Sequence, residues 1–552
     1  MSTFTELELP RLSTTYRERY ENSGAWSDET FVDRFESAFE QYPDAEIVGP
    51  NRRLTFGALA DEVERVSAGL QELGVGPGDV VSYQLPNWIT TSVVHLAVSR
   101  VGAVANPIIP IYRHSEVEYI LNDGGSKCVF VPASFRDFDY PEMIADIATA
   151  CPELAHVVVV GEQTSDDAVD ALESVSYHDL EASDPDSFTR PAIDANDIHA
   201  LLYTSGTTAD PKGVLHTHNT LLFEQRKTIE LLGLSGETTV FMPSPVTHVT
   251  GMLYALELPF MSGMDLVLMD VWDPVDAIEL IDEHRCNFTV GATPFLQGIN
   301  ENAPDGWDCP LRVFACGGAD IPPELVRDAT KTLGCTVQRV YGSTEYPTAT
   351  WPPLDAPLEK LAETDGPAAP AAELKVVDIE TGDELPPGEK GVLLAHGPEL
   401  MVGYLGEELN EDAFDGPWFD TGDLAVVDSD GYVEITGRMK DIIVRGGENI
   451  PVKDVEDRLF EHPAIEEVAV VAMPDPEMQE KGCAYVKLVP GESLTFEEMI
   501  EYLDEQGIAK QKYPERLEVL DGFPKTASGK IQKNVLREEI ADELGLEPIT
   551  RE

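Results

Sequence analysis

Residues 201–213 read Leu-Leu-Tyr-Thr-Ser-Gly-Thr-Thr-Ala-Asp-Pro-Lys-Gly, an apolar strand end followed by a loop rich in hydroxyl groups. Gly206 allows the backbone to come close to a ligand, and successive N–H groups with Ser and Thr hydroxyls form an anion-binding nest. Lys212 adds a positive charge suited to phosphate. The spacing does not match a Walker A loop, and an isolated loop of this kind is more often an ordinary polar turn. Because hydroxyls, glycine and lysine converge here, we interpret it as a candidate phosphate loop.

Apolar β-branched runs alternate with helical patterns on both sides of this loop. Such alternation predicts βαβ units, and therefore an α/β fold with largely parallel sheets and flanking helices. We expect helices at residues 87–100, 115–122, 276–284 and 323–333, and strands at residues 103–107, 128–131, 288–290, 311–315 and 337–341.

The chain changes character twice after residue 374. Short strands separated by Gly-containing turns first predict a small β-rich module. Beyond residues 437–441 the pattern is that of a compact α+β unit, with helices at 452–460, at 496–505 and from 531, and strands at 468–471, 484–488 and 517–519. We therefore predict two domains, residues 1–437 and residues 438–552.

Four further polar clusters stand at predicted strand ends or turns, namely residues 341–345, residues 418–423, residues 437–441 with 446–449, and residues 524–530. Open α/β sheets bind ligands where their strands end. Glu345 is a suitable ligand for Mg²⁺ together with phosphate oxygens, and Asp423 could bridge ribose hydroxyls. Each cluster is a weak signal by itself, because Asp423 alone is more often a turn residue and Lys530 alone an exposed loop cation.

Together, in this order and at this spacing, the five clusters resemble the acyl-adenylate-forming superfamily, which includes acyl-CoA synthetases, luciferases and the adenylation domains of peptide synthetases. The resemblance spans residues from roughly 50 to 540. It implies a large N-terminal domain of about 440 residues followed by a C-terminal lid of about 110, in agreement with the boundary placed above.

The resemblance implies a role for each matching residue. The expected ATP-binding set is Thr204, Ser205, Gly206, Thr207, Thr208 and Lys212 at the phosphates, Gly317, Gly318, Ala319, Tyr341 and Gly342 at the adenine, and Asp423 and Arg438 at the ribose. The remaining matches are Thr344 and Glu345 at the α-phosphate and Mg²⁺, Lys530 as the catalytic lysine of the lid, Lys440 as the hinge, and Gly446 and Gly447 where the lid approaches the pantetheine arm of CoA. Ala209 and Lys533 depart conservatively from the family's usual Gly and Arg.

The implied chemistry has two steps and uses ATP, Mg²⁺ and CoA. A carboxylate attacks the α-phosphorus of MgATP to give acyl-AMP and pyrophosphate, and a thiolate then displaces AMP. The first step depends mainly on positioning and charge neutralisation. We therefore expect an ATP-dependent carboxylic acid–CoA ligase whose catalytic residues are Lys530, Thr344, Glu345 and His248.

Residues 241–251 resemble the family segment that carries an aromatic or His gate beside the acyl pocket. His248 is the expected gate, although it could instead be a structural histidine. Gly291, Thr293 and Tyr346 are expected to line the same pocket. With residues 271–274, this combination resembles the branch of short- and medium-chain fatty acyl-CoA and cyclohexanecarboxylate–CoA ligases. The bulk of Tyr346 is expected to shorten the pocket.

Three alternatives stay open. We expect CoA as the acceptor because no carrier domain follows the lid, but a ligase that loads a separate carrier protein would have the same motifs. An oxidative, luciferase-like reaction is the second alternative. A non-catalytic acidic binding protein of the same fold is the third, and the intact Lys212, Glu345, Asp423, Arg438 and Lys530 argue against it.

Acidic residues far outnumber basic ones in the 552-residue chain, with 101 Asp and Glu against 38 Lys and Arg and a formal net charge of −63. Nucleic-acid surfaces and polybasic membrane patches need a cationic footprint that this composition does not supply. The acid is spread along the chain, which indicates a solvated, self-repelling surface that salt screens. Our hypothesis is a salt-rich cytosol, as in a halophilic microbe; an acidic mesophilic protein is the alternative.

The chain also shows no signal for export or membrane insertion. Its N-terminus has neither the basic nor the apolar region of a signal peptide, and the most apolar stretch, residues 92–111, is interrupted by polar residues and prolines. The seven Cys are scattered and never form CxxC, which is typical of buried thiols in a reducing cytosol rather than of a metal site. We expect a cytoplasmic protein.

The salt hypothesis predicts that multi-molar KCl raises the thermal melting temperature above its value in dilute buffer, because counterions screen the repulsion among surface carboxylates. Thermal unfolding followed by circular dichroism at both salt concentrations tests this. A higher melting temperature in dilute buffer would contradict it.

Overall fold

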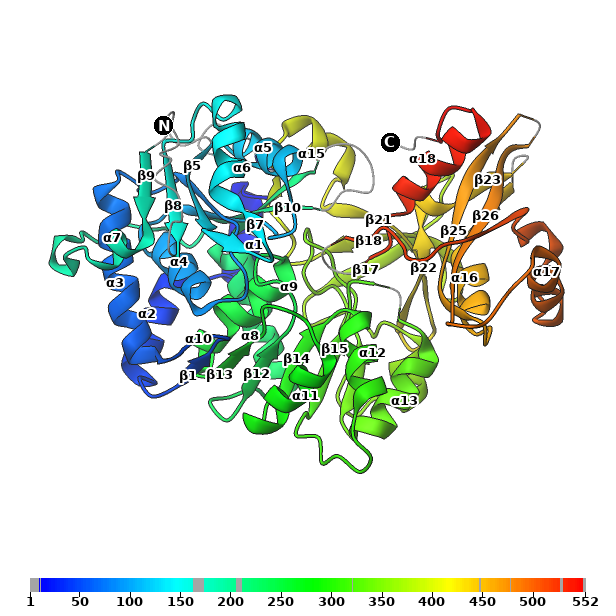
Figure 1. Ribbon diagram of the computed structural model, residues 1–552, viewed down its shortest axis with the longest axis horizontal. Helices are drawn as coiled ribbons and strands as arrows, with labels where there is room; N and C mark the ends of the chain where they lie inside the picture. The colour runs from blue at the N-terminus through cyan, green and yellow to red at the C-terminus, as the bar shows by residue number, and fades with distance from the viewer. Residues whose placement is uncertain are drawn as a thin grey trace.

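The computed structural model of the protein describes residue 9 and residues 11–161, 173–204, 211–319, 321–445, 448–476, 478–526 and 530–549. Two sheets with their helices make up the larger part of the molecule, and a smaller C-terminal unit lies at the right of Figure 1.

The first sheet is mostly parallel and has its central strands buried on both faces. Its order is β19 (Gly403–Tyr404), β11 (Gly213–Thr217), β10 (Ile198–Tyr203), β4 (Val104–Pro107), β3 (Val80–Tyr83), β5 (Ser126–Pro132), β8 (His156–Val160) and β9 (Glu173–Ser176). Only the pairs β10–β11 and β11–β19 are antiparallel. The nearly continuous apolar strands fit a parallel sheet covered by helices on both faces.

The second sheet is parallel except for its edge pair β1–β2. Its order is β16 (Thr336–Arg339), β15 (Val313–Cys316), β14 (Phe288–Gly291), β12 (Thr239–Met242), β13 (Asp265–Leu268), β1 (Glu46–Val48) and β2 (Arg53–Thr55). Its strands β14, β15 and β16 follow one another along the chain with helices between them, as expected for βαβ units.

Helices cover both sheets and fill the layer between them. They are α1 (Thr14–Ser23), α2 (Phe31–Gln41), α3 (Phe56–Glu72), α4 (Ile89–Arg100), α5 (His114–Asp123), α6 (Tyr140–Ile147), α7 (Tyr177–Glu181), α8 (His218–Leu232), α9 (Val249–Gly251), the π-helical segment Met252–Glu257, α10 (Leu258–Ser262), α11 (Pro274–Glu283), α12 (Thr293–Asn302), α13 (Pro323–Leu333) and α14 (Leu358–Glu363). In Figure 1, α11, α12 and α13 flank the second sheet, while α8, α9 and α10 lie between the two sheets.

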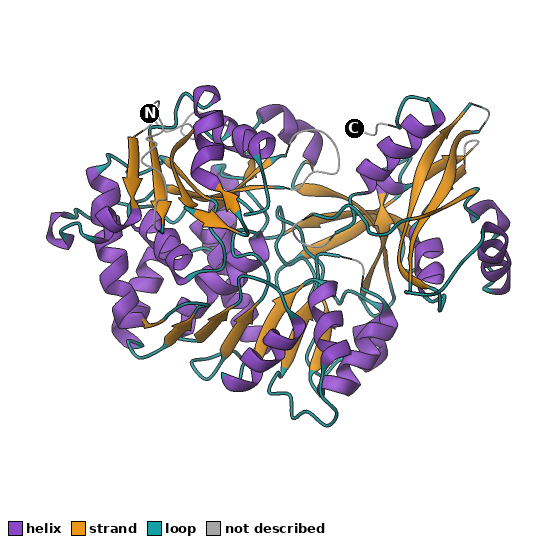
Figure 2. Cartoon of the chain, in the orientation of Figure 1, coloured by secondary structure: helices purple, strands orange, loops and turns teal. Residues whose placement is uncertain are grey.

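A third, antiparallel sheet belongs to the same body and lies between the two large sheets and the C-terminal unit, as the orange strands of Figure 2 show. It contains β17 (Glu373–Val377), β18 (Lys390–His396), β21 (Trp418–Val427), β20 (Phe414–Asp415) and β22 (Val433–Arg438), with α15 (Glu407–Ala413) beside it. A separate small hairpin is formed by β6 (Ser134–Phe135) and β7 (Phe138–Asp139).

The C-terminal unit, residues 443–549, is called the lid below and has a sheet and apolar clusters of its own. Its strands are β24 (Glu448–Ile450), β23 (Ile443–Arg445), β26 (Gln479–Leu488), β25 (Ile465–Asp475) and β27 (Arg516–Val519), and its helices are α16 (Lys453–Phe460), α17 (Phe496–Glu505) and α18 (Lys533–Leu544). Residues 439–442 connect β22 of the third sheet to β23 of the lid.

The expected α/β fold class, with largely parallel sheets, a small β-rich module and an α+β C-terminal unit, is confirmed. Helix α17 occupies the predicted residues because Thr495 and Glu498 form a capping box at its start. The predicted strand at 468–471 is the centre of the longer β25, which pairs with β26 along its whole length. Charged residues such as Glu466 and Glu467 on this strand hide its alternating pattern.

The layer between the two sheets contains a buried polar cluster. One carboxylate oxygen of Glu257 lies 3.2 Å from His95 Nε2 and 2.9 Å from His199 Nε2, and Gln225 donates to the other. Burial alone raises the pKa of Glu257, but contact with His199 and His95 lowers it below its ordinary value. The three potential metal-ligand atoms lie within 4.8 Å of one another. His199 Nδ1 has no hydrogen-bond partner in the described part of the chain, whereas metal-bound histidines almost always have one, so we describe a hydrogen-bonded cluster.

The N-terminal segment forms hydrogen bonds with residues far along the chain. Arg11 is buried and donates to the carbonyl oxygens of Gly397 at 2.7 Å and Leu400 at 3.0 Å. Trp26 Nε1 donates to Pro398 O at 2.9 Å. Burial lowers the pKa of Arg11, and these carbonyls satisfy a charge that would be costly without partners.

No helix among the described residues is both long and apolar enough to cross a membrane. All seven Cys are free thiols, and every one except Cys309 is buried.

Buried histidines predict a loss of stability in acid. Burial lowers the pKa of His216 to about 4 and holds that of His218 well below 6.5. The unfolded chain therefore binds more protons than the folded one once the pH falls below about 6.5. The stabilising contribution is complete above that pH and is lost as the pH falls towards the folded pKa; for His216 alone the loss amounts to about 2–3 kcal/mol by about pH 4.5.

Urea unfolding in constant high KCl, at several pH values between about 7 and 4.5, measures this loss. His216→Gln, which cannot take up the proton, should show a shallower fall in the free energy of unfolding than the wild type. Equal pH dependence of the two proteins would contradict the assignment.

Candidate active site

Several predicted site residues lie at the carboxyl ends of parallel strands from both large sheets. Thr204 follows β10, Gly291 ends β14, and Gly317 follows β15. The two ends of the predicted phosphate loop meet, because Thr204 N donates to Lys212 O at 3.1 Å. Residues 205–210, which include the predicted Ser205, Gly206, Thr207 and Thr208, lie outside the described residues.

Two glycines at these strand ends are required by close packing. A Cβ on Gly317 would lie 2.7 Å from Val340 O, and a Cβ on Gly342 would lie 1.9 Å from Pro347 O. Gly318, next to the first of these, has a φ of 83°, in the left-handed region that favours glycine. Gly318 is exposed and Ala319 half-buried, so this rim of the predicted adenine pocket is open to solvent.

Tyr341, Asp423 and Arg438 form one connected group. The Tyr341 hydroxyl donates to Asp423 Oδ2 at 2.6 Å, and Arg438 Nε lies 3.1 Å from Asp423 Oδ1. Asp423 and Arg438 are opposite each other in the β21–β22 register. Burial raises the pKa of Asp423 against the lowering effects of Arg438, Tyr341 and Lys530, and Asp423 in turn raises the pKa of Arg438. Asp423 of β21 and Arg438 of β22 thus form an ion pair across adjacent strands, with the Tyr341 hydroxyl bound to the carboxylate.

Glu345 and Lys212 are joined by a residue that sequence reasoning missed, Tyr404. Its hydroxyl donates to Glu345 Oε1 at 2.8 Å, and Lys212 Nζ lies 5.1 Å from the centre of its ring. The second such residue is His216, whose Nε2 lies 2.8 Å from Thr344 O. Neither stands in a recognisable motif, since Tyr404 belongs to a two-residue strand; the closely spaced pair His216 and His218 was the only signal available.

The loop that carries Thr344 and Glu345 is held in place by buried charged residues that bind at Thr348. Thr348 N donates to Glu399 Oε1 at 2.8 Å, and Lys227 of α8 forms an ion pair with Glu399 and donates to Thr348 O. Thr348 Oγ1 also donates to Glu224 Oε1 at 3.1 Å. Burial raises the pKa of Glu399 to about 7, although Lys227 lowers it.

Lys530 of the lid lies near two groups of the large body. Its charge contributes to lowering the pKa of His248, which burial lowers to about 4, and it also lowers the pKa of Asp423. Its backbone N–H donates to Thr526 Oγ1 at 3.1 Å. The lid therefore contributes a cation to the same region as Asp423 and Arg438.

The junction between body and lid is rich in charged groups. Lys440, in the short 3₁₀ turn Met439–Asp441, has its pKa lowered by partial burial and by the nearby charges of Lys212 and Arg438. Arg537 of α18 lies 3.4 Å from the Lys440 carbonyl oxygen and 3.0 Å from Asp441 Oδ1.

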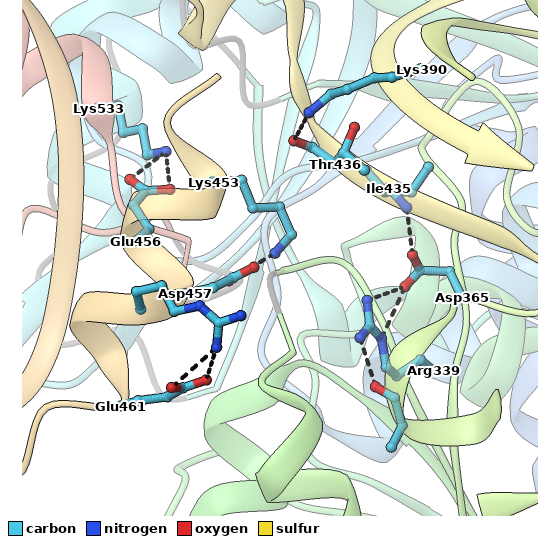
Figure 3. A network of polar contacts seen from close by, with 12 residues as sticks. Arg339, Asp365, Lys390, Ile435, Thr436, Lys453, Glu456, Asp457, Glu461 and Lys533 are labelled. Atoms are coloured by element: carbon cyan, nitrogen blue, oxygen red, sulfur yellow. Dashed lines mark hydrogen bonds and ion pairs between the residues drawn. The ribbon is translucent and has the colours of Figure 1, made fainter. Parts of the chain in front are cut away.

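Figure 3 shows polar contacts on the two sides of this junction. In the lid, Lys533 pairs with Glu456 at 2.8 Å and Lys453 with Asp457 at 3.2 Å. In the body, Asp365 joins Arg339 at 3.0 Å to the backbone N–H of Ile435 at 2.9 Å. The ion pairs of the lid and those of the body in this view thus each join residues of the same unit. Gly446 and Gly447, predicted to approach CoA, lie outside the described residues.

The predicted acid-binding residues differ in exposure. His248 is half-buried and caps α9, with Nδ1 3.4 Å from Thr250 N, and Thr293 begins α12. A Cβ on Gly291 would lie 3.1 Å from the ring of Phe295. Tyr346 is 2% exposed and its hydroxyl donates to His396 O at 3.3 Å, so its polar end is satisfied by the backbone of β18.

Comparisons with known proteins identify relatives over nearly the whole chain. Residues 35–405 match the family model described as AMP-binding enzyme, and residues 454–530 match the AMP-binding enzyme C-terminal domain. The medium-chain fatty-acid–CoA ligase of Escherichia coli (strain K12) is 37% identical over 95% of this chain and 93% of its own length. The vibriobactin-specific 2,3-dihydroxybenzoate-AMP ligase of Vibrio cholerae is 31% identical over 96% of this chain and 97% of its own.

Solved structures agree with these matches. ATP-bound MatB from Rhodopseudomonas palustris superposes with a TM-score of 0.83 at 27% identity, over 93% of this chain and 99% of that one. The anthranilate CoA ligase AuaEII in complex with anthranoyl-AMP gives a TM-score of 0.85 at 25% identity, over 94% and 98%.

The geometry around Tyr404 predicts separable contributions to binding MgATP. Tyr404→Phe removes the donor to Glu345 but keeps the ring beside Lys212, and should raise the Kd for MgATP roughly tenfold. Tyr404→Leu also removes the cation–π contact and should raise the Kd a further threefold or so. Isothermal titration calorimetry measures both. Wild-type affinity in Tyr404→Phe would show that the Glu345 contact has no role in binding.

Proposed function

The chain belongs to the AMP-binding enzyme family of AMP-forming acid–CoA ligases, and we propose that it activates a short- or medium-chain fatty or alicyclic acid with ATP and then transfers the acyl group to CoA. ATP binding and adenylate-forming ligase chemistry follow from the family. The acid, the acceptor and the roles of individual residues are the proposal.

One observation carries this proposal. Lys530 comes from the lid, yet its charge acts on both His248 and Asp423 of the body. A lid cation within electrostatic reach of both a candidate acid gate and a candidate ribose ligand is suited to the place where the substrate carboxylate and the α-phosphate meet. We therefore assign Lys530 as the group that neutralises the negative charge of the adenylation transition state.

The other residues of the site divide into nucleotide ligands and an acid gate. Asp423, with Arg438 beside it, is proposed to bind the ribose hydroxyls, and Tyr341 to lie against the adenine with the backbone of residues 317–319. Lys212 is proposed to supply positive charge at the phosphates, together with the loop that ends at this residue. Burial, together with the charge of Lys530, lowers the pKa of His248 to about 4, so it is neutral at pH 7 and is proposed to serve as a gate rather than as a cation.

The residues around Glu345 fit a magnesium ion. One of its carboxylate oxygens accepts from Tyr404, and the other has no hydrogen-bond partner among the described residues. Mg²⁺ prefers one or two carboxylates together with phosphate oxygens and water. When bound, the ion would neutralise phosphate charge. Thr344 and Glu345 are proposed to contact the α-phosphate and the ion, respectively.

The second step is proposed to use a rotation of the lid about Lys440, with residues 1–437 and 438–552 as the two moving parts. Lys440 lies in the only chain segment that connects β22 of the body to β23 of the lid. Hinges of this kind absorb a large change in φ and ψ within a few residues. Gly446 and Gly447 follow the hinge closely and are proposed to meet the pantetheine arm of CoA.

The acid is proposed from the resemblance of residues 241–251 and 271–274 and from the name of the Escherichia coli relative, a medium-chain fatty-acid–CoA ligase. Gly291 and Thr293 are proposed to line the pocket, with Tyr346 limiting its depth. The name of the 2,3-dihydroxybenzoate-AMP ligase relative favours, as the second candidate, an aryl acid that is joined to AMP. The setting is proposed to be a salt-rich cytoplasm, supported by the net charge of −63.

The test is pyrophosphate exchange into ATP with a panel of acids, in high KCl with Mg²⁺. Octanoate, butyrate and cyclohexanecarboxylate should support exchange better than 2,3-dihydroxybenzoate, and CoA should then yield the thioester. Lys530→Ala should reduce exchange by roughly 100-fold or more, as the loss of an electrostatic stabiliser does elsewhere.

Lys510→Ala is the matched control, because this lysine is also in the lid but its side chain is 82% exposed; it should retain wild-type exchange. Exchange with the aryl acid alone, or acyl-AMP that accumulates in the presence of CoA, would favour the second candidate. Near-wild-type exchange in Lys530→Ala would show that its assignment is wrong.

A further inference from the structure

We infer that His216 is a positioning residue that holds the loop of Thr344 and Glu345 in register with the strand that follows the phosphate loop. This inference rests on the proposed function, because it gives that loop its contacts to the α-phosphate and Mg²⁺. It concerns a residue that contacts no ligand itself and acts through the backbone.

The position of His216 connects two segments that must bind the same nucleotide. Strand β11 begins at Gly213, immediately after Lys212, and His216 is its fourth residue. The imidazole is completely buried, with Nε2 2.8 Å from Thr344 O and Nδ1 3.1 Å from Thr220 Oγ1 of α8. A single ring therefore spans the space between the start of α8 and the peptide after Thr344.

The protonation state of the ring follows from its partners. Burial lowers the pKa of His216 to about 4, so the ring is neutral at pH 7 and has one N–H. Thr344 O can only accept a hydrogen bond, so that hydrogen is on Nε2. Nδ1 is then the acceptor that faces the Thr220 hydroxyl. The ring is a fixed donor to the loop rather than an acid or base.

The same strand also determines where Tyr404 lies. Val214 of β11 pairs with Tyr404 of β19, and Tyr404 donates to the Glu345 carboxylate. Met401 N donates to Glu345 O at 2.7 Å. Within the described part of the chain, His216 is the only residue that donates to the Thr344 carbonyl oxygen. Without it, the peptide between Thr344 and Glu345 can rotate and move both side chains.

Two substitutions separate the donor to Thr344 from the rest of the ring. In His216→Gln the side-chain amide nitrogen reaches the position of Nε2 and can still donate to Thr344 O. In His216→Asn the amide reaches only the position of Nδ1, so the contact with Thr220 can form but that with Thr344 cannot. The two variants are otherwise alike in charge and polarity.

The expected result is a selective loss in the first half-reaction. His216→Asn should lower kcat for acid-dependent pyrophosphate exchange roughly 10- to 100-fold, because one hydrogen bond is lost and a buried carbonyl is left without a donor. The KM for the acid should change less than about threefold, since His248, Gly291 and Thr293 of the proposed acid pocket lie on other segments. His216→Gln should stay within about threefold of the wild type.

Two further measurements separate positioning from general damage to the fold. Thioester formation from presynthesised acyl-AMP and CoA should fall much less than pyrophosphate exchange in His216→Asn, because that step keeps the α-phosphate near Thr344 but uses neither pyrophosphate nor Mg²⁺; a folding defect would lower both half-reactions equally. The pH–rate profile of His216→Gln should match that of the wild type, since the ring transfers no proton. A shifted profile would overturn the inference.

MgATP binding, measured by calorimetry, makes the inference independent of the acid used. His216→Asn should bind MgATP more weakly than His216→Gln. A wild-type protein that binds MgATP but exchanges pyrophosphate with no acid would overturn the proposed function alone. Equal affinity and equal exchange in His216→Asn and the wild type would overturn the positioning role.

Discussion

The mutual repulsion of cations is the constraint on which this site depends. Lys212, Arg438, Lys440 and Lys530 lie near enough to influence one another or the same acid. Like charges at close range destabilise a fold unless carboxylates or ligands offset them. Asp423 does this from within the β21–β22 register, where it is opposite Arg438. Arg438 is also the last residue of β22, directly before the segment that leads to the lid.

A buried polar layer gives this arrangement its rigidity. The face of α8 that lies between the sheets contributes Glu224, Gln225 and Lys227, each with a partner on another element. When one partner of such a buried pair is removed, the other is left buried without a hydrogen bond. The resulting loss of stability is larger than the net stabilisation that the contact contributed. The loop of Thr344 and Glu345 is therefore held by α8 and β11 together.

Most of the fold could be predicted from local sequence patterns, whereas contacts between residues far apart in the sequence could not. Helix α13 was predicted at its observed bounds because its apolar spacing ends at Gly334, which adopts a left-handed conformation. The family motifs likewise indicated Asp423, Arg438 and Lys530 by residue type and order. Tyr404 and His216 were missed because each acts on residues more than fifty positions away, at 59 for Glu345 and 128 for Thr344. The need for glycine at position 342 was equally hidden, since it arises from the carbonyl of Pro347.

The hydrogen bonds of Arg11 to distant residues also limit how early the N-terminal segment can reach its final position during translation. Its carbonyl partner at Gly397 lies 386 residues further along the chain. At ordinary translation rates roughly 20 to 80 s separate the emergence of the two from the ribosome. During that interval the guanidinium lacks both of its carbonyl partners, and the first sheet lacks its edge strand β19, which is made just after Gly397. The two large sheets are thus completed only when about three-quarters of the polypeptide exists, and a nascent chain shorter than that lacks part of the surface on which the N-terminal segment later packs.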